Sequence, residues 1–229
     1  MTKPVYVLVH GAWGGAWCWE KFTEDLESRG ASWRTLDLPS SQVGTDPQSD
    51  LAVDAKVVAD VANEVEGPVV LVGHSYAGSV ITQAAPQVRE LEGLFFIAAT
   101  VPEIGQSHSD NAREVRVRTA MDDAIHLDGA LLTLDLDAAA MALYQDCTPE
   151  LREWAKARLS VQTLASFRGA RTAQDVDVAK RYVLCTRDHA LDASLQEAVS
   201  KGCDEVERLE SDHSPFLSHS GQLAEILIG

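Results

Sequence analysis

One junction between a strand-like and a helix-like segment constrains the fold of this chain more than any other feature. An apolar run, Val-Val-Leu-Val at 69–72, leads into Gly-His-Ser-Tyr-Ala at 73–77 and then into a helix-forming stretch. A turn this sharp brings the strand and helix backbones close together, so the residues two positions before and after the serine must be small. Gly73 and Ala77 meet this condition. The junction therefore predicts a nucleophile elbow that holds the Ser75 hydroxyl out of a sheet.

Strand-like and helix-like segments alternate along most of the sequence. Short, mostly apolar segments predict strands at 5–10, 68–72, 94–99 and 181–186, and the alternation with helices places two more strands at 32–38 and 205–209. Apolar residues at helical spacing predict one helix that ends near Gly30 and others at 51–65, 76–85, 193–201 and 215–228. Such alternation is typical of βαβ units, in which a mainly parallel sheet carries helices on both faces. We therefore expect an α/β fold with a six-stranded, mainly parallel core.

The rhythm changes between the fourth and fifth predicted strands. This part of the chain is rich in Ala, Leu and Asp, shows no clear strand and predicts two or three helices. One of these helices should begin at Thr148 as its N-cap, with Pro149 in the first helical position. We therefore expect a core made of 1–102 and 178–229, interrupted by a helical cap insertion at 103–177.

Composition excludes several classes of function. The 229 residues include 19 Lys and Arg against 35 Asp and Glu, a net charge of −16. Such a surface repels phosphate backbones and anionic membranes, so we expect neither a nucleic-acid partner nor a membrane partner. The sequence shows no secretory signal and no apolar run long enough to span a membrane. Its four cysteines have no metal-like spacing, which predicts reduced thiols, a cytoplasmic location and no metal site.

A glycine-rich segment follows the first predicted strand. Residues 10–15 read His-Gly-Ala-Trp-Gly-Gly, and such small residues allow the backbone to approach a substrate. The Ala12 N–H in this segment is therefore a candidate donor to an oxyanion. The Tyr76 N–H is the other candidate, because the elbow leaves it free at a helix N-terminus. Trp13 would lie near the pocket mouth and contact substrate, although a packing role is equally compatible with the sequence. Taken alone, the segment could also be an ordinary turn.

A serine nucleophile needs a base and an orienting carboxylate. Among the seven histidines, His213 is the preferred base because it follows the last predicted strand and directly precedes a helix. Asp188 is the preferred acid because it lies just beyond the end of the fifth predicted strand. Asp192 is better suited to cap a helix, and Asp212 adjoins His213, where neighbouring side chains usually point apart.

Taken together, these motifs resemble the α/β-hydrolase superfamily, whose nucleophile, acid and base follow the order Ser75, Asp188, His213. The chain looks most similar to a small branch with plant methylesterases, hydroxynitrile lyases and bacterial carboxylesterases of the pyrethroid-hydrolase type. The resemblance covers nearly the whole chain. It is carried by segments 7–19, 73–78, 182–188 with Gln196, 212–216 and 143–150.

Three departures narrow what this resemblance implies. Ala77 replaces the commoner glycine of the elbow. Ser214 stands where the cyanogenic lyases carry a lysine, which disfavours that lyase chemistry. The plant methylesterases have a Cys-His pair where this chain has Trp13 and Gly14, so their substrates cannot be transferred.

The sequence thus predicts a cofactor-free serine hydrolase that cleaves a carboxylic ester or lactone of a small, neutral, largely apolar molecule. A carbon–carbon lyase or cyclase on the same triad is the first alternative, and a non-catalytic binding protein is the second. The insertion should supply the pocket wall, with Tyr144, Trp154 and Phe167 as candidate lining or packing residues. A homodimer is left open.

Overall fold

The computed structural model describes residues 3–113 and 117–229, so residues 114–116 of the predicted insertion lie outside it. Its main sheet has six strands in the spatial order β2-β1-β3-β4-β8-β9, and all five strand pairs are parallel. The strands are Val5–Val9 (β1), Ser32–Thr35 (β2), Val69–His74 (β3), Leu91–Ile97 (β4), Ala179–Cys185 (β8) and Glu205–Leu209 (β9). The predicted six-stranded parallel core is therefore confirmed.

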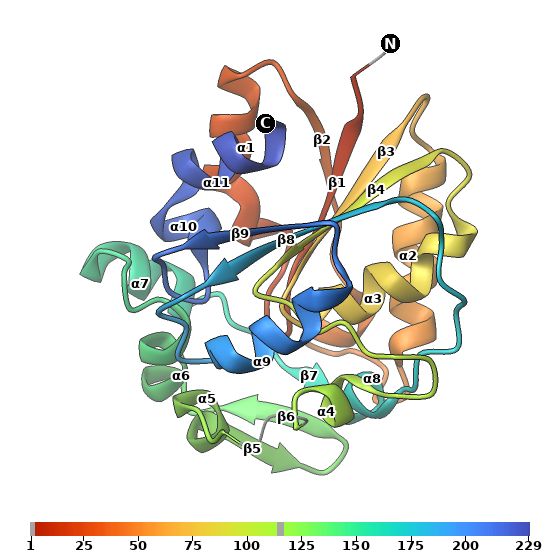
Figure 1. Ribbon diagram of the computed structural model, residues 1–229. Helices are drawn as coiled ribbons and strands as arrows, with labels where there is room; N and C mark the ends of the chain where they lie inside the picture. The colour runs from red at the N-terminus through yellow and green to blue at the C-terminus, as the bar shows by residue number, and fades with distance from the viewer. Residues whose placement is uncertain (1–2, 114–116) are drawn as a thin grey trace.

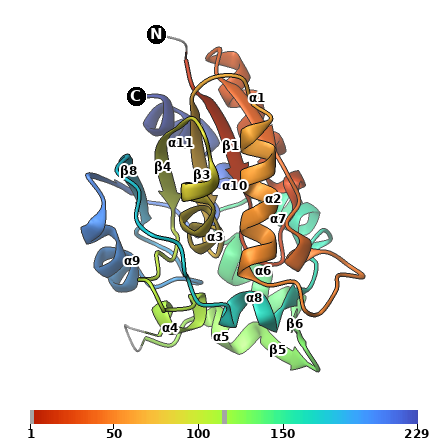
Figure 2. The same ribbon diagram turned by 90° about the vertical axis from the view of Figure 1, so that its right-hand side faces the viewer.

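Helices cover both faces of this sheet (Figures 1 and 2). Helices α1 (Glu20–Ser28) and α11 (Ser220–Ile228) pack together on one face. Helices α2 (Leu51–Asn63) and α3 (Ala77–Ala84) pack together on the other face, and α9 (Ala193–Val199) contacts β8. Strands covered on both faces must be largely apolar, and this explains why the central strands β1, β3 and β4 are nearly continuous apolar runs. The edge strands β2 and β9 are more polar.

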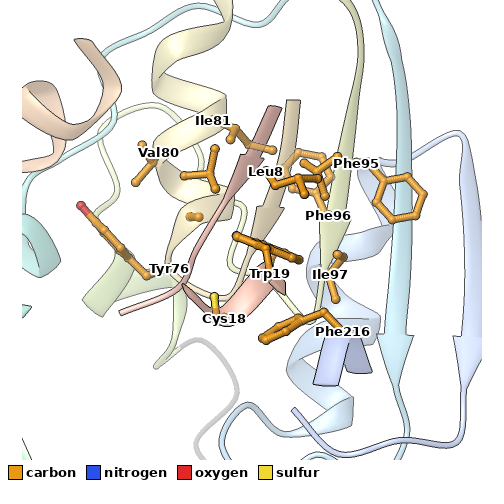
Figure 3. Close-up of a cluster of buried hydrophobic side chains, with 14 of the residues drawn as sticks. Leu8, Cys18, Trp19, Tyr76, Val80, Ile81, Phe95, Phe96, Ile97 and Phe216 are labelled. Atoms are coloured by element: carbon orange, nitrogen blue, oxygen red, sulfur yellow. The ribbon is translucent and has the colours of Figure 1, made fainter. Parts of the chain in front are cut away.

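A cluster of buried apolar side chains surrounds the central strands of the sheet (Figure 3). Trp19 is fully buried, and its ring centroid lies 4.7 Å from that of Phe216 at the start of the C-terminal helices. Leu8 of β1 and Ile97 of β4 are also completely buried in this cluster. Trp19 is therefore a packing residue that fixes the first and last parts of the chain against the central strands.

The segment between β4 and β8 is not purely helical, so that expectation is wrong. Its described residues, 98–113 and 117–178, form five short helices and a separate antiparallel sheet in the order β5-β6-β7. The helices are α4 (His108–Asn111), α5 (Ala120–Ala124), α6 (Leu136–Leu143), α7 (Pro149–Lys156) and α8 (Leu164–Arg168). The strands are β5 (Ile125–Asp128), β6 (Leu131–Leu134) and β7 (Gln162–Thr163). The Thr148 hydroxyl caps α7 by accepting from the Leu151 N–H, as predicted.

The insertion covers the carboxyl ends of the parallel strands, while the start of β1 and the end of α11 lie at the opposite end of the molecule (Figures 1 and 2). The predicted last helix is in fact two helices, α10 (Pro215–Ser218) and α11, because the backbone leaves the helical conformation at His219. No helix in the described part of the chain is long and apolar enough to cross a membrane. The loops at the carboxyl edge of the sheet therefore face the insertion. Ligands of open α/β sheets bind at this edge.

Candidate active site

Ser75 occupies a strained turn between β3 and α3. Its φ of 55° lies in the left-handed region, which side chains other than glycine rarely adopt. The turn is held by backbone hydrogen bonds, because the Ser75 N–H donates to the Ile97 carbonyl and the Ser75 carbonyl accepts from Gly78 and Thr100 N–H groups. A Cβ at Gly73 would lie 2.8 Å from the Ala77 carbonyl oxygen. The small residue at Gly73 is therefore required by close backbone approach, as the motif predicted.

The structure brings His213 and Asp188 together from two different loops. Asp188 follows β8, His213 follows β9, and the His213 Nδ1 lies 2.6 Å from the Asp188 Oδ2. Both side chains are buried. The rival carboxylates lie elsewhere: Asp192 caps α9 through the Ser194 N–H, and Asp212 accepts from the Asp146 N–H.

Asp188 is held in place by three further donors. Its Oδ1 accepts the N–H groups of Ala190 at 2.7 Å and Leu191 at 2.8 Å. Its Oδ2 accepts from Gln196 Nε2 at 2.9 Å, as well as from His213. Gln196 carried part of the family resemblance, but the sequence did not indicate this contact. With four hydrogen bonds, the carboxylate has one orientation available to it.

Three other histidines are buried near the elbow, and burial lowers the pKa of each. The His10 Nδ1–H donates to the Gly11 carbonyl while its Nε2 accepts from the Leu38 N–H. Burial and the nearby His213 lower the pKa of His74, whose Nε2–H donates to the His213 carbonyl at 2.8 Å. The same two causes lower the pKa of His108 to about 3. All three imidazoles are therefore neutral at pH 7.

The two predicted oxyanion donors have different surroundings. Ala12 lines the cavity, and its N–H has no acceptor among the described residues. The next N–H along the chain, that of Trp13, is already used by the Gln162 side chain at 3.3 Å. Tyr76 precedes α3, and its side chain points away to donate to Asp54 at 2.8 Å, which leaves only its backbone to serve the site.

A cavity of about 320 Å³ lies between the elbow and the insertion. The core contributes Gly11, Ala12, Trp13, Gly14, Cys18, His74, Ser75, Ala190, Leu191, His213, Ser214 and Phe216 to its wall. The insertion contributes His108, Ser109, Ala112, Arg113, Thr119, Met121, Asp122, Ile125, Leu132, Leu143, Tyr144, Leu164 and Phe167. Most of these side chains are apolar or aromatic, which is typical of a small-molecule pocket.

Four aromatic residues singled out from the sequence have distinct positions. Tyr144 and Phe167 are buried and line the cavity. Trp13 lines it as a buried wall residue and not at an exposed mouth, because its indole N–H donates to the Leu132 carbonyl at 2.9 Å. Trp154 is not part of the cavity wall and instead packs edge-on against Trp17.

His108 is a cavity residue that sequence reasoning missed as part of the pocket. It belongs to α4 of the insertion, and its Nδ1 lies 2.9 Å from the Thr100 hydroxyl oxygen. Its ring centroid is 4.2 Å from that of Phe167. No sequence signal could have found it, because its place in the wall depends on how the insertion folds over the core.

A strained serine after a central parallel strand, with an acid and a histidine supplied by the last two strand ends, defines the α/β-hydrolase class. Comparison with known proteins agrees with this layout. A family model described as the alpha/beta hydrolase family matches residues 6–226, and the chain belongs to that family.

Similar curated proteins span almost the whole chain. Norfluorocurarine synthase 2 from Strychnos sp is 29% identical over 259 residues, which cover 97% of this chain and 93% of that protein. Polyneuridine aldehyde esterase from Rauvolfia serpentina is 26% identical over 251 residues, covering 97% and 94%. Among solved structures, a pyrethroid hydrolase from Sphingobium faniae JZ-2 superposes with a TM-score of 0.86 at 23% identity, covering 99% of this chain and 96% of that one. The resemblance to esterases of this branch is thus confirmed.

Proposed function

We propose that this protein is a serine esterase that cleaves a carboxylic ester or lactone through an acyl-enzyme. The observation that carries the proposal is the hydrogen bond of 2.6 Å between His213 Nδ1 and Asp188 Oδ2, in a cavity wall shared with the strained Ser75. Relatives named as esterases, including polyneuridine aldehyde esterase and Esterase PIR7B from Oryza sativa, support the same class.

The proposed reaction has two halves. Ser75 Oγ attacks the carbonyl carbon while His213 takes its proton, and His213 then returns that proton to the departing alcohol. Asp188 fixes the imidazole tautomer and stabilises the imidazolium without itself becoming protonated. Water resolves the acyl-enzyme by the same route, with His213 as base again. The Ala12 and Tyr76 N–H groups bind the oxyanion, and each contributes roughly 2.7–4 kcal/mol by analogy with measured donors.

The cavity favours a small, largely apolar substrate. Its wall combines the Trp13 and Phe167 rings, which lie edge-on at 5.5 Å, with aliphatic residues of the insertion. The net charge of −16 opposes the approach of strongly anionic molecules. We therefore propose neutral esters with a short aliphatic or aromatic group as substrates.

The test is turnover of short-chain p-nitrophenyl esters by wild type and by Ser75→Ala. The variant should lose at least about 10⁴-fold in kcat, because the nucleophile is gone. Ser28→Ala removes an exposed hydroxyl from α1 and should retain wild-type activity. Full esterase activity in Ser75→Ala would refute the assignment.

A second candidate is lyase or cyclase chemistry in which the same residues only transfer protons. It is favoured by one observation, the relative named norfluorocurarine synthase 2 at 29% identity. A burst of alcohol release in stopped-flow would identify ester cleavage, because an acyl-enzyme that accumulates gives a burst and proton transfer does not. Ligand binding without any turnover on an ester and lactone panel would instead support a binding protein.

A further inference from the structure

Two carboxylates outside the cavity bind one another's backbone. The Asp146 N–H donates to Asp212 Oδ2 at 3.0 Å, and the Asp212 N–H donates to Asp146 Oδ2 at 2.9 Å. Asp146 belongs to the insertion, in the segment between α6 and α7, whereas Asp212 directly precedes His213 in the core. This reciprocal pair, here called the Asp146–Asp212 clasp, joins the insertion to the loop that carries the proposed base.

The clasp also reaches the loop that carries the proposed acid. Arg187, the residue before Asp188, donates from Nη2 to Asp146 Oδ2 at 2.7 Å and to the Glu210 carbonyl at 3.1 Å. Gln145 donates from Nε2 to the Arg187 carbonyl at 2.6 Å. The segment 145–146 therefore touches both loops at the residue next to each member of the His213–Asp188 pair.

The insertion holds its side of the clasp firmly. Arg152 of α7 donates to the carbonyls of Tyr144 at 3.1 Å, Gln145 at 3.1 Å and Cys147 at 3.2 Å. Tyr144 also lines the cavity, only two residues from Asp146. One short, braced segment thus contacts the space for substrate and the two catalytic loops.

Burying the Asp212 carboxylate costs free energy, so a role beyond packing would explain why it is there. Asp212 is completely inaccessible to solvent, and burial raises the pKa of its carboxyl group. A second carboxylate, that of Asp146, lies beside it, and its side chain is 17% exposed. A buried charge costs free energy unless hydrogen bonds compensate it. A network in which each group is hydrogen-bonded also holds its residues in one geometry. Neither aspartate lines the cavity, so substrate contact does not explain them.

We propose that the Asp146–Asp212 clasp is a positioning device that keeps the loops of His213 and Asp188 in register with Ser75. The clasp acts through these loops and does not touch the reacting atoms. The inference rests on the proposed function for its kinetic consequences, while its structural consequence can be measured independently of any activity.

The kinetic test compares Asp146→Ala with a matched control in the same insertion. Asp137→Ala removes a carboxylate of equal charge, but Asp137 is exposed on α6, where its side chain pairs with Lys156 at 2.8 Å and, among the described residues, contacts neither loop. Asp146→Ala should lower kcat by about 10–100-fold, because small displacements of catalytic groups cost that much. Its KM should change by less than about twofold, because the cavity wall is untouched. Asp137→Ala should match wild type, and Asp146→Asn, which keeps an acceptor for the Asp212 N–H, should recover part of kcat.

The structural test is hydrogen exchange of backbone amides, read at a temperature at which each variant is folded. In Asp146→Ala, amides in 186–191 and 210–214 should exchange faster, while those of β3 stay as in wild type. Unchanged exchange in both loops, or a kcat within about twofold of wild type, would overturn the clasp. If wild type neither turns over esters nor labels at Ser75 with a fluorophosphonate, the proposed function fails, and exchange alone decides the clasp.

Discussion

Gln196 shows how a single side chain can fix the proposed acid. It is fully buried, and its Oε1 accepts from the Cys185 N–H at 2.9 Å. Its Nε2 donates to Asp188 Oδ2 at 2.9 Å and to the Leu191 carbonyl at 2.7 Å. Both polar atoms of the amide therefore have a partner at the end of β8 or in the loop that carries Asp188.

Replacing Gln196 by leucine should damage both stability and activity. The change leaves the Cys185 N–H and the Leu191 carbonyl unpaired in the core, which should lower the free energy of unfolding by about 1–3 kcal/mol. Asp188 loses one of its donors, so kcat should fall by about 10–100-fold. Urea denaturation and steady-state kinetics measure the two effects.

Gln222→Leu is the matched control for this change. Gln222 is exposed on α11, and its replacement should alter the free energy of unfolding by no more than about 0.5 kcal/mol. A Gln196→Leu protein with wild-type kcat would show that Asp188 needs no help from this amide.

At the scale of elements, the β3–α3 junction depends on two glycines. Besides Gly73, Gly78 in the first turn of α3 faces Ala99 so closely that a Cβ there would lie 2.7 Å from the Ala99 Cβ. The same Cβ would collide with the Thr100 carbonyl oxygen. The helix can therefore start directly after Ser75 only because it leaves room for the chain that follows β4.

Gly78→Ala should destabilise the protein by about 1–3 kcal/mol, because overpacking at this contact forces the backbone to shift. Esterase activity should fall with it, since Ser75 sits on the displaced turn. Gly202→Ala is the control, because a Cβ at Gly202 meets no atom within 4 Å. Equal urea midpoints for the two variants would contradict the close-approach argument.

The sequence predicted the strands of the main sheet well and the insertion poorly, for a physical reason. The strands β3 and β4 are buried on both faces, so packing demands long apolar runs that the sequence displays. The strands β5 and β6 have only four residues each, and apolar segments this short are equally compatible with a helix. The turn between β5 and β6 consists of Gly129 and Ala130, and Gly129 has a φ of 60°, which glycine adopts readily.

Some residues of the proposed site could be predicted from the sequence and others could not. Ser75, Asp188 and His213 follow strand ends, so chain order and strand prediction were enough to select them as candidates, and their roles remain predictions. Gln196 and His108 depend on how a helix and the insertion pack, which no local pattern encodes. The division at 103 and 177, the cytoplasmic location and the homodimer likewise remain predictions.

At the scale of the whole molecule, the buried neutral histidines predict an acid-sensitive fold. A histidine whose pKa is lowered on folding stabilises the folded state at pH above its unfolded value near 6.5, and this contribution is lost as the pH falls. For His108, with a folded pKa of about 3, the loss runs from about pH 6.5 down to about pH 3. Burial of Asp54 raises the pKa of its carboxyl group to about 6 and opposes this trend between about pH 4 and 6.

Comparison with His108→Leu isolates the histidine, because Asp54 contributes equally to both proteins. Between pH 5.5 and pH 4, the free energy of unfolding of wild type should fall relative to that of the variant by about 1.4 kcal/mol per pH unit. Urea denaturation at several pH values measures the difference. His126→Leu, at an exposed position in β5, should run parallel to wild type. Parallel curves for His108→Leu as well would rule out this source of acid sensitivity.

The position of β9 at one edge of the sheet bears on how copies of the protein meet. An open edge offers unpaired backbone groups to any passing strand, and charged side chains along it discourage such additions. Glu205, Glu207 and Arg208 are all exposed on this short strand, and a second copy docking edge to edge would have to remove these charges from water. The protein should therefore resist strand-mediated aggregation at high concentration, and a homodimer should use another surface.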